Sequence, residues 1–203
     1  MTSCDRHVVE YRGAVRRRHR EDLNRHKSGV YWLTGLSGSG KSTLAHLTEE
    51  RLYNMGMRTY VFDGDNVRKG LCRDLSFSPE GRSENIRRIG EMVRLFVDAG
   101  IMCLTAFISP YREDREKVRC LVGGDDFYEI YVKCALKECE KRDAKGLYAL
   151  AREGRIKNYT GISSPYEEPE DPDLVLETDK CSVEECVDKL IDFIVSGSKV
   201  DLS

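Results

Sequence analysis

The sequence predicts an α/β fold in which a mainly parallel central sheet lies between two layers of helices. Three observations support this class. Short apolar segments alternate with helical ones, the run 101–108 is almost wholly apolar, and a glycine-rich loop, Gly35–Ser42, separates the first strand from the first helix. Parallel strands joined by right-handed helical crossovers form such three-layer domains. A chain of 203 residues fits one domain with a sizeable core.

Five strands are expected from short apolar or alternating segments, at 30–34, 58–62, 101–108, 127–133 and 174–176. The first has the continuous apolar character of a buried strand and leads directly into the glycine-rich loop. The second ends in Asp63-Gly64-Asp65-Asn66. The run 101–108 is typical of a central parallel strand that is buried on both faces.

Helices are expected between the strands, at about 42–55, 79–98, 112–122, 136–142 and 182–197. Ser78 and Pro79 supply an N-cap and a first-turn proline for the second helix. That helix carries an apolar stripe at helical spacing, formed by Ile86, Ile89, Val93, Phe96 and Val97. Ser182 to Glu185 forms a capping box that opens the last helix.

Residues 143–172 interrupt this alternation, because glycines and prolines punctuate a polar stretch rich in Arg and Lys. Long irregular segments in compact domains are often functional. We therefore expect a mobile lid over 143–172, within a domain that spans 29–197 and is followed by a tail at 198–203. An exposed connection without a function is the simpler alternative.

Residues 1–28 are expected to form an N-terminal basic arm, since the tract Arg16–Arg20 lacks a sustained apolar face. A solvated extension is the simplest interpretation. An arm that crosses a dimer, or an electrostatic guide for anionic substrates, are the alternatives.

Composition narrows the function classes. A net charge of −2 and a pI near 6.1 argue against a dedicated nucleic-acid binder. The eight cysteines include no C-x-x-C pair, and no His stands at metal-ligand spacing, which argues against zinc. Cysteines inside apolar patterns indicate a reduced, cytoplasmic protein. The sequence has no signal-peptide pattern and no run of 18 apolar residues, so no membrane association is expected.

The loop Gly35–Ser42 has the G-x-x-x-x-G-K-S spacing of a phosphate-binding loop. Its glycines let successive N–H groups converge on phosphate oxygens at the start of the next helix. Lys41 would reach the β- and γ-phosphates, and the Ser42 hydroxyl would bind Mg²⁺. The loop therefore predicts a nucleotide with Mg²⁺, the alternative being an ordinary Gly/Ser-rich turn.

Asp63 and Asp65 follow the second strand, at the sheet edge where open α/β sheets bind ligands. They should face the same crevice as the loop, although Asp-Gly also occurs in plain turns. Phosphoryl transfer needs Mg²⁺, cations and a carboxylate near the accepting hydroxyl. The sequence has no Asn-Lys-x-Asp for guanine selection and no apolar strand followed by Asp-Glu. A small-molecule kinase therefore fits best.

Six ordered blocks carry a more specific resemblance. They are Gly-Leu-Ser-Gly-Ser-Gly-Lys-Ser-Thr (35–43), Asp-Gly-Asp-Asn-Val-Arg (63–68), Phe-Ser-Pro-Glu-Gly-Arg-Ser-Glu-Asn (77–85), Phe-Ile-Ser-Pro-Tyr-Arg (107–112), Lys-Gly-Leu-Tyr (145–148) and Tyr-Thr-Gly-Ile (159–162). From about residue 28 to 195 the chain resembles the adenylyl-sulfate (APS) kinase family of P-loop kinases. The resemblance implies a P-loop NTPase fold and transfer of the γ-phosphate of ATP to the 3′-hydroxyl of APS, which gives PAPS and ADP in sulfate activation. Another P-loop kinase, for a nucleoside monophosphate or a sugar acid, and a non-catalytic nucleotide-sensing module are the alternatives.

The resemblance also implies roles on the donor side. Catalysis would depend on Lys41, Asp63, Asp65 and Ser109, and Mg²⁺ would lie on Ser42 and Asp63. ATP would be held by the phosphate loop and, near its adenine, by two later residues: Gly35, Leu36, Ser37, Gly38, Ser39, Gly40, Lys41, Ser42, Thr43, Arg152 and Cys181.

On the acceptor side, the implied APS-binding residues are Asp65, Arg68, Phe77, Arg82, Asn85, Ile108, Ser109, Lys145, Asn158 and Tyr159. The two arginines and the asparagine would hold the phosphosulfate, because planar guanidinium groups suit such oxyanions. Phe77 and Tyr159 would sandwich the APS adenine, the family more often carrying Phe at the second position. Asp65 would orient the 3′-hydroxyl, and Lys145 and Asn158 would come from the lid.

Ser109 has two interpretations. Family descriptions name a serine at this position as a phosphorylated intermediate, yet the sequence places no evident base beside it. Ser109 before Pro110 would also serve as an N-cap for the following helix. We expect direct in-line transfer without a phosphoenzyme. The family further implies a homodimer, and ATP sulfurylase is a candidate partner.

Overall fold

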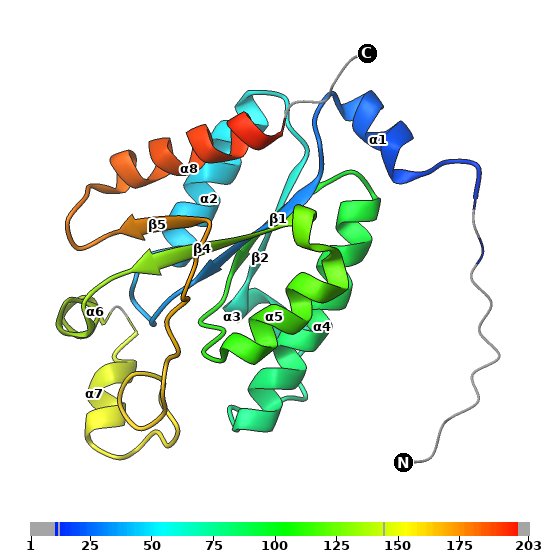
Figure 1. Cartoon of the computed structure of the whole chain (residues 1–203). Helices are drawn as coiled ribbons and strands as arrows, with labels where there is room; N and C mark the ends of the chain where they lie inside the picture. The colour runs from blue at the N-terminus through cyan, green and yellow to red at the C-terminus, as the bar shows by residue number, and fades with distance from the viewer. Residues whose placement is uncertain (1–10, 12, 144, 199–203) are drawn as a thin grey trace.

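The computed structural model describes residues 11, 13–143 and 145–198, and its five strands form one all-parallel sheet (Figure 1). The strand order is β2-β3-β1-β4-β5. The strands are β1 (Gly29–Thr34), β2 (Thr59–Asp63), β3 (Met102–Ala106), β4 (Phe127–Lys133) and β5 (Leu174–Glu177). All five predicted strands are confirmed, with ends that differ from the prediction by at most two residues.

The described helices are α1 (Arg17–Asn24), α2 (Lys41–Asn54), α3 (Gly64–Lys69), α4 (Pro79–Asp98), α5 (Arg112–Val122), α6 (Leu136–Arg142), α7 (Leu147–Arg152) and α8 (Val183–Gly197), with a 3₁₀ turn, η1, at Gly124–Asp126. Helices α2 and α8 cover one face of the sheet, and α4 and α5 cover the other (Figure 1). The predicted three-layer architecture is therefore confirmed. None of the helices in the described ranges is long and apolar enough to cross a membrane.

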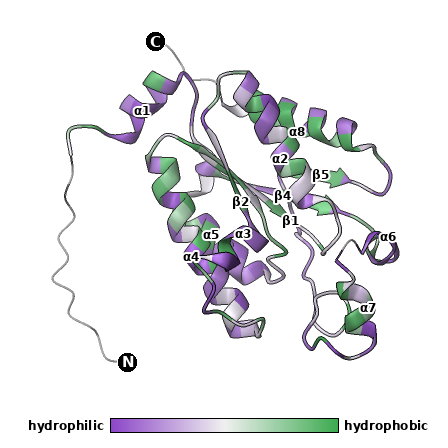
Figure 2. Ribbon diagram, turned by 180° about the vertical axis from the view of Figure 1, so that it is seen from behind, coloured by the Kyte–Doolittle hydropathy of each residue, from purple (hydrophilic) through white to green (hydrophobic). Residues whose placement is uncertain are grey.

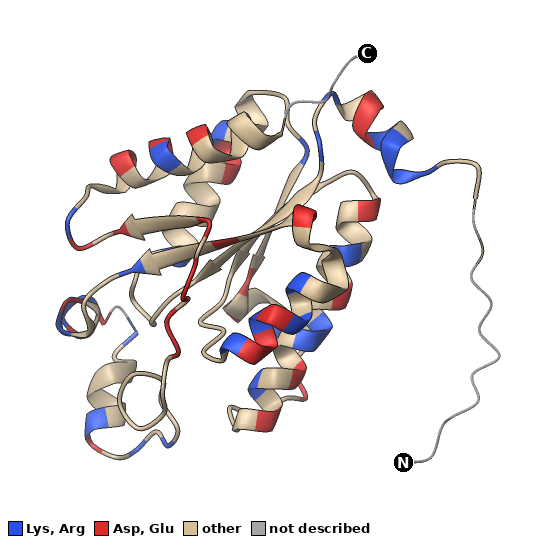
Figure 3. Cartoon of the chain, in the orientation of Figure 1, with Lys and Arg blue, Asp and Glu red and all other residues tan. Residues whose placement is uncertain are grey.

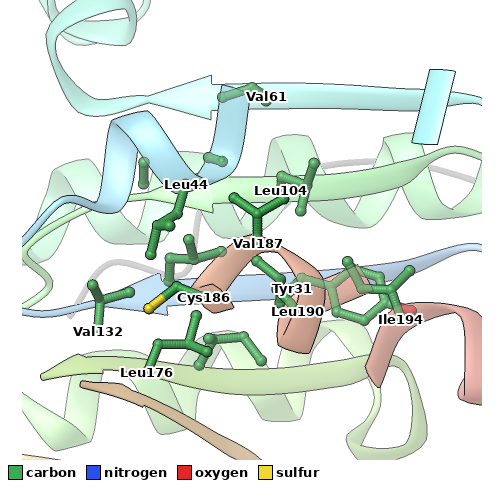
Figure 4. Packing of buried hydrophobic residues seen from close by; sticks show 14 of the residues in the cluster. Tyr31, Leu44, Val61, Leu104, Val132, Leu176, Cys186, Val187, Leu190 and Ile194 are labelled. Carbon is green, nitrogen blue, oxygen red and sulfur yellow. The ribbon is translucent and has the colours of Figure 1, made fainter. Parts of the chain in front are cut away.

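The central strand β1 is buried along its whole length and contributes side chains to both halves of the core. Tyr31 and Leu33 pack with α2 and α8, in the cluster that Figure 4 shows, whereas Val30 and Trp32 pack with α4 and α5. This division follows from the two-residue period of a strand, and burial on both faces explains the continuous apolar run. Complete burial of a side chain of this size contributes about 1.5–3 kcal/mol.

Both predicted helix starts are confirmed. The Ser78 hydroxyl accepts from the Gly81 N–H at the start of α4, with Pro79 in the first turn. Ser182 and Glu185 form the capping box of α8, and hydrophobic and hydrophilic residues alternate along that helix (Figure 2).

Helix α1 differs from the expected extension. It has no buried residue, and polar contacts hold it against the domain. Arg17 forms an ion pair with Asp126, and Arg20 with Asp98. A helix without an apolar stripe leaves no periodic signal in the sequence. The rest of the predicted arm, residues 1–10 and 12, and the tail at 199–203 lie outside the described residues.

Helices α3 and α7 were also not expected. Asp63 ends β2 and caps α3, since its carboxylate accepts from the Asp65 N–H at 3.0 Å. Helix α7 lies within residues 143–172, and this range is called the lid segment from here on. The acidic end of the lid segment, 167–172, runs beside α5, where Arg112 pairs with Glu170 (Figure 3).

The carboxyl ends of β1, β2 and β3 meet at one edge of the sheet. Residues 35–40 and 107–111 form the loops after β1 and β3, and α3 follows β2 directly, so three of the six motif blocks begin at this edge. Helices α6 and α7 lie at the same edge in Figure 1. The crevice expected at the ends of the strands is therefore where the fold brings these motifs together.

Candidate active site

The phosphate loop turns between β1 and α2 through glycines in conformations that favour glycine. Gly38 has φ 74° and Gly40 has φ 101°. At Gly35, a Cβ atom would lie 2.4 Å from the Val132 carbonyl oxygen, so any side chain there would displace β4. The loop ends at Lys41, the first residue of α2, which places the N-terminus of that helix behind it.

Lys41 is buried against its own loop. Its Nζ donates to the carbonyl oxygens of Gly35 at 2.9 Å and Leu36 at 2.6 Å, and only 7% of the residue is exposed. Burial lowers the pKa of Lys41 to about 8, despite the nearby Asp63 carboxylate. The Lys41 ammonium group is thus held against the phosphate loop and is weakly solvated.

Three side chains that the sequence analysis missed hold the other side of the loop. Tyr148 Oη donates to the Ser37 carbonyl oxygen at 2.9 Å, and Thr178 Oγ1 donates to that of Ser39 at 2.8 Å. Arg142 Nη1 reaches the Gly38 carbonyl oxygen at 3.4 Å. Tyr148 had a signal in the sequence, as part of the Lys-Gly-Leu-Tyr block, whereas Arg142 and Thr178 lie outside all six blocks.

Asp63 contacts the loop directly. The Ser42 hydroxyl donates to Asp63 Oδ2 at 2.5 Å, as the shared crevice predicts. Hydroxyl and carboxylate oxygens are ligands that Mg²⁺ accepts, and this ion usually takes one or two protein ligands together with phosphate and water. The pair therefore fits a nucleotide-bound Mg²⁺. Thr43 follows on α2 and is exposed.

Asp65 lies on α3, two residues beyond Asp63, and is exposed. Its carboxylate forms an ion pair with Lys145 of the lid segment. On the same helix, Arg68 stacks over the Phe77 ring at 4.2 Å, while 62% of Phe77 is exposed. Two predicted acceptor residues from separate blocks are thus in contact, and Asp65 meets the lid.

Arg82 connects α4 to the lid segment. Its guanidinium donates to the Phe77 carbonyl oxygen at 3.0 Å, to Thr160 Oγ1 at 2.9 Å and to the Asn158 carbonyl oxygen at 2.8 Å. Asn158 has φ 56°, a left-handed conformation that asparagine tolerates. Thr160, which the sequence analysis did not single out, is 1% exposed.

Asn85 and Tyr159 are both buried. Asn85 Oδ1 has no hydrogen-bond partner among the described residues, which is unusual for a buried amide oxygen. The Tyr159 ring packs edge-on against Tyr148, with 5.0 Å between the ring centroids, in a small apolar cluster shared by the lid segment, α6 and the phosphate loop. Phe77 and Tyr159 are linked through Arg82, which contacts Phe77 and both neighbours of Tyr159.

The predicted N-cap role of Ser109 is wrong. Tyr111 occupies the N-cap of α5, and the Ser109 hydroxyl instead accepts from Trp32 Nε1 at 3.1 Å and donates to Thr34 Oγ1 at 2.9 Å. Ser109 is 2% exposed and has φ 38°. The carbonyl oxygen of Ile108, which is half-buried, accepts from Thr34 Oγ1 at 2.8 Å.

Arg152 and Cys181 lie on separate elements, helix α7 and the turn before α8. Arg152, on α7, pairs with Glu140 of α6. Cys181 is half-buried in the turn before α8, three residues after Thr178. No hydrogen bond joins either side chain to the phosphate loop in the described part of the chain.

Comparisons with known proteins agree with this geometry. The family model described as adenylylsulphate kinase matches residues 27–177. The adenylyl-sulfate kinase of Thermodesulfovibrio yellowstonii is 55% identical over 200 residues, covering 98% of this chain and 100% of the relative. The solved Mycobacterium tuberculosis APS kinase, in complex with AMPPNP and APS, is 45% identical with a TM-score of 0.79, over 83% of this chain and 98% of that chain.

A hexameric APS kinase from Thiobacillus denitrificans is 29% identical with a TM-score of 0.64, over 85% of this chain and 30% of that chain. The family match spans the phosphate loop, the Asp63–Asp65 turn and the lid segment. The chain therefore belongs to the adenylyl-sulfate kinase family.

Proposed function

We propose that this site transfers the γ-phosphoryl group of ATP directly to the 3′-hydroxyl of APS, with donor and acceptor halves that meet at the Asp63–Asp65 turn. One observation carries the assignment. Asp63 bonds the Ser42 hydroxyl of the phosphate loop, while Asp65 pairs with Lys145 of the lid segment. The junction of β2 and α3 thus belongs to both halves of one site.

In the donor half, the loop N–H groups and Lys41 bind the ATP phosphates, and Ser42 and Asp63 hold Mg²⁺. When bound, Mg²⁺ neutralises charge on the β- and γ-phosphates. Lys41 exchanges its bonds to the Gly35 and Leu36 carbonyl oxygens for bonds to phosphate. Arg152 and the backbone near Cys181 border the adenine of ATP.

In the acceptor half, Asp65 orients the 3′-hydroxyl of APS, and Lys145 supplies positive charge beside it. Arg68 and Arg82 hold the phosphosulfate together with Asn85, whose side-chain N–H group can donate to an oxyanion. The exposed Phe77 ring stacks on the APS adenine. Four further residues complete the pocket: Ile108, Ser109, Asn158 and Tyr159.

Transfer without a phosphoenzyme is supported by the surroundings of Ser109. Its hydroxyl is enclosed between Trp32 and Thr34, and none of its hydrogen-bond partners is a base. In direct transfer, the 3′-oxygen of APS bonds to the γ-phosphorus as the bond to the departing ADP oxygen breaks. Ser109 then shapes the floor of the site.

We further propose a cytoplasmic homodimer in which 29–197 form the catalytic domain and 143–172 close over the substrates. Association with ATP sulfurylase is a separate proposal that pull-down of the purified pair would test. Light scattering of the purified chain is expected to give twice the monomer mass.

A coupled ADP-release assay with APS, AMP and gluconate as acceptors tests the reaction. APS is expected to support turnover at least 100-fold above the other two, because AMP lacks the sulfate that the arginines would contact and gluconate lacks a base for the exposed Phe77 ring. Turnover with AMP and none with APS would overturn the proposal. An Asp65→Ala variant that still binds both nucleotides, with a parent that shows no turnover, would favour a nucleotide-sensing module.

A further inference from the structure

Tyr148 is a residue of the lid segment whose hydroxyl reaches the phosphate loop. Its side chain is almost fully buried, and its Oη donates to the Ser37 carbonyl oxygen at 2.9 Å. Burial raises the pKa of Tyr148 above its ordinary value, so the hydroxyl remains a donor at neutral pH. Of the block Lys145–Tyr148, only Lys145 has a role in the reaction proposed above.

The Ser37–Gly38 peptide shows what this hydrogen bond does. A trans peptide unit is planar, and its C=O and N–H groups point in opposite directions. No peptide bond in the described ranges is cis. Fixing the Ser37 carbonyl group therefore aims the Gly38 N–H at the opposite side of the loop. That N–H has no hydrogen-bond partner among the described residues, so it is free to meet a phosphate oxygen.

Neighbouring carbonyl groups are held in the same way. Arg142 contacts the Gly38 carbonyl oxygen at 3.4 Å, and Thr178 contacts that of Ser39 at 2.8 Å. Three consecutive peptide units of the loop thus receive donors from outside it. Arg142 ends α6 and Thr178 follows β5, so Tyr148 is the donor that belongs to the lid segment.

The same turn of the lid also reaches the acceptor half. Lys145, three residues before Tyr148, pairs with Asp65. The Tyr148 ring packs against Tyr159, and Leu36 of the phosphate loop joins this apolar cluster. A single short turn therefore contacts the acceptor carboxylate at one end and the donor loop at the other.

We infer that Tyr148 is a positioning residue for the donor nucleotide: its hydroxyl fixes the Ser37–Gly38 peptide so that the Gly38 N–H meets the donor phosphate. The shape of the phosphate loop then depends on the position of the lid. The identity of the donor, ATP, rests on the proposed function.

The test is Tyr148→Phe, which removes the hydroxyl and keeps the ring. Loss of one neutral hydrogen bond is expected to weaken ADP binding about three- to tenfold in calorimetric titration, with a matching rise in KM for ATP. KM for APS is expected to change less than about twofold, because the acceptor contacts remain. Tyr128→Phe is the matched control. Tyr128, on β4, also donates its hydroxyl to a backbone carbonyl oxygen, that of Asp125 at 3.1 Å, and this bond lies away from the phosphate loop.

An unchanged ADP affinity in Tyr148→Phe, with a lowered Tm, would overturn the inference and leave the hydroxyl a purely structural group. Thr178→Val provides a second variant, because valine keeps the shape and removes the donor to Ser39. Thr178→Val is expected to weaken ADP binding although Thr178 lies outside the lid segment. An unchanged affinity for ADP would contradict the idea that Tyr148 and Thr178 orient the peptide units of the loop. ADP titration needs no APS, so failure of the proposed acceptor chemistry in the parent would be seen separately.

Discussion

Lys41 carries a pH dependence that follows from its burial. Its pKa lies at about 8, below the ordinary value of 10.5. In the free enzyme, the ammonium group is therefore lost as pH rises through about 8, and kcat/KM for ATP is expected to fall over this range. A pH profile of kcat/KM, which reports the free enzyme, measures the effect. A profile that stays flat to above about pH 9 would contradict it.

The same residue affects stability in the opposite sense. Between about pH 8 and 10.5, the unfolded chain keeps a proton on Lys41 that the native state has lost. This residue therefore makes the free energy of unfolding of the nucleotide-free protein rise with pH across that window. Lys41→Met is expected to remove this rise in urea titrations and to lower kcat about 100-fold or more, because the phosphates lose a positioned cation.

Ser109→Ala is expected to retain activity within about tenfold of the parent, since the hydroxyl contacts Trp32 and Thr34 and no base. The free energy of unfolding should fall by about 1–3 kcal/mol, because the buried Trp32 N–H loses its acceptor. Steady-state ADP release and urea denaturation measure the two effects. Complete loss of activity, together with a phosphoserine trapped in the native enzyme, would establish the covalent route instead.

Among the elements, α8 allows a test of the capping box that the sequence predicts at the start of this helix. Ser182→Ala removes the hydroxyl that accepts from the Glu185 N–H at 3.2 Å and should destabilise the fold by about 1 kcal/mol without changing turnover. Ser196→Ala, at the other end of the same helix, is the control and should stay within about 0.5 kcal/mol. Equal effects of the two substitutions in urea titrations would refute the capping role.

Elements with a local apolar pattern could be predicted from the sequence, and those without one could not. Helices α4 and α8 have both a cap and an apolar stripe, and their bounds were predicted closely. Helix α3 has six residues and no buried one, so Asp63-Gly64 looked like a plain turn. Helix α1 depends on ion pairs with residues about 80–110 positions away, which no local pattern reveals.

At the scale of the whole molecule, the same limit applies to the candidate active site. The phosphate loop and Asp63 were predictable because each stands at the end of a strand with its own motif. Arg142 and Thr178 were not, since they meet the loop only after β4 and β5 have been placed beside β1. The N-cap role of Ser109 was wrongly predicted for a related reason: its partners, Trp32 and Thr34, come from the distant strand β1.

The sequence motifs and helix α1 lie at opposite ends of the sheet. The motifs lie at the carboxyl ends of the strands, and α1 docks at the amino ends (Figure 1). There Arg17 binds Asp126, which precedes β4, and the Ser28 carbonyl oxygen at 3.0 Å, which precedes β1. Arg17→Met would leave the Asp126 carboxylate without this partner. We expect the free energy of unfolding to fall by about 1–3 kcal/mol, with kcat and both KM values unchanged.

Arg18→Met is the matched control, since the Arg18 side chain is 87% exposed and its one ion pair within the described ranges is a 4.0 Å contact with Asp22. Its effect in urea titrations should stay within about 0.5 kcal/mol. Because the two arginines are neighbours with equal charge, a change in KM for ATP or APS shared by both variants would mean that the basic tract guides anionic substrates. A change confined to the monomer–dimer equilibrium would instead support an arm that crosses the dimer. Loss of stability in Arg17→Met alone identifies α1 as an anchor of the domain.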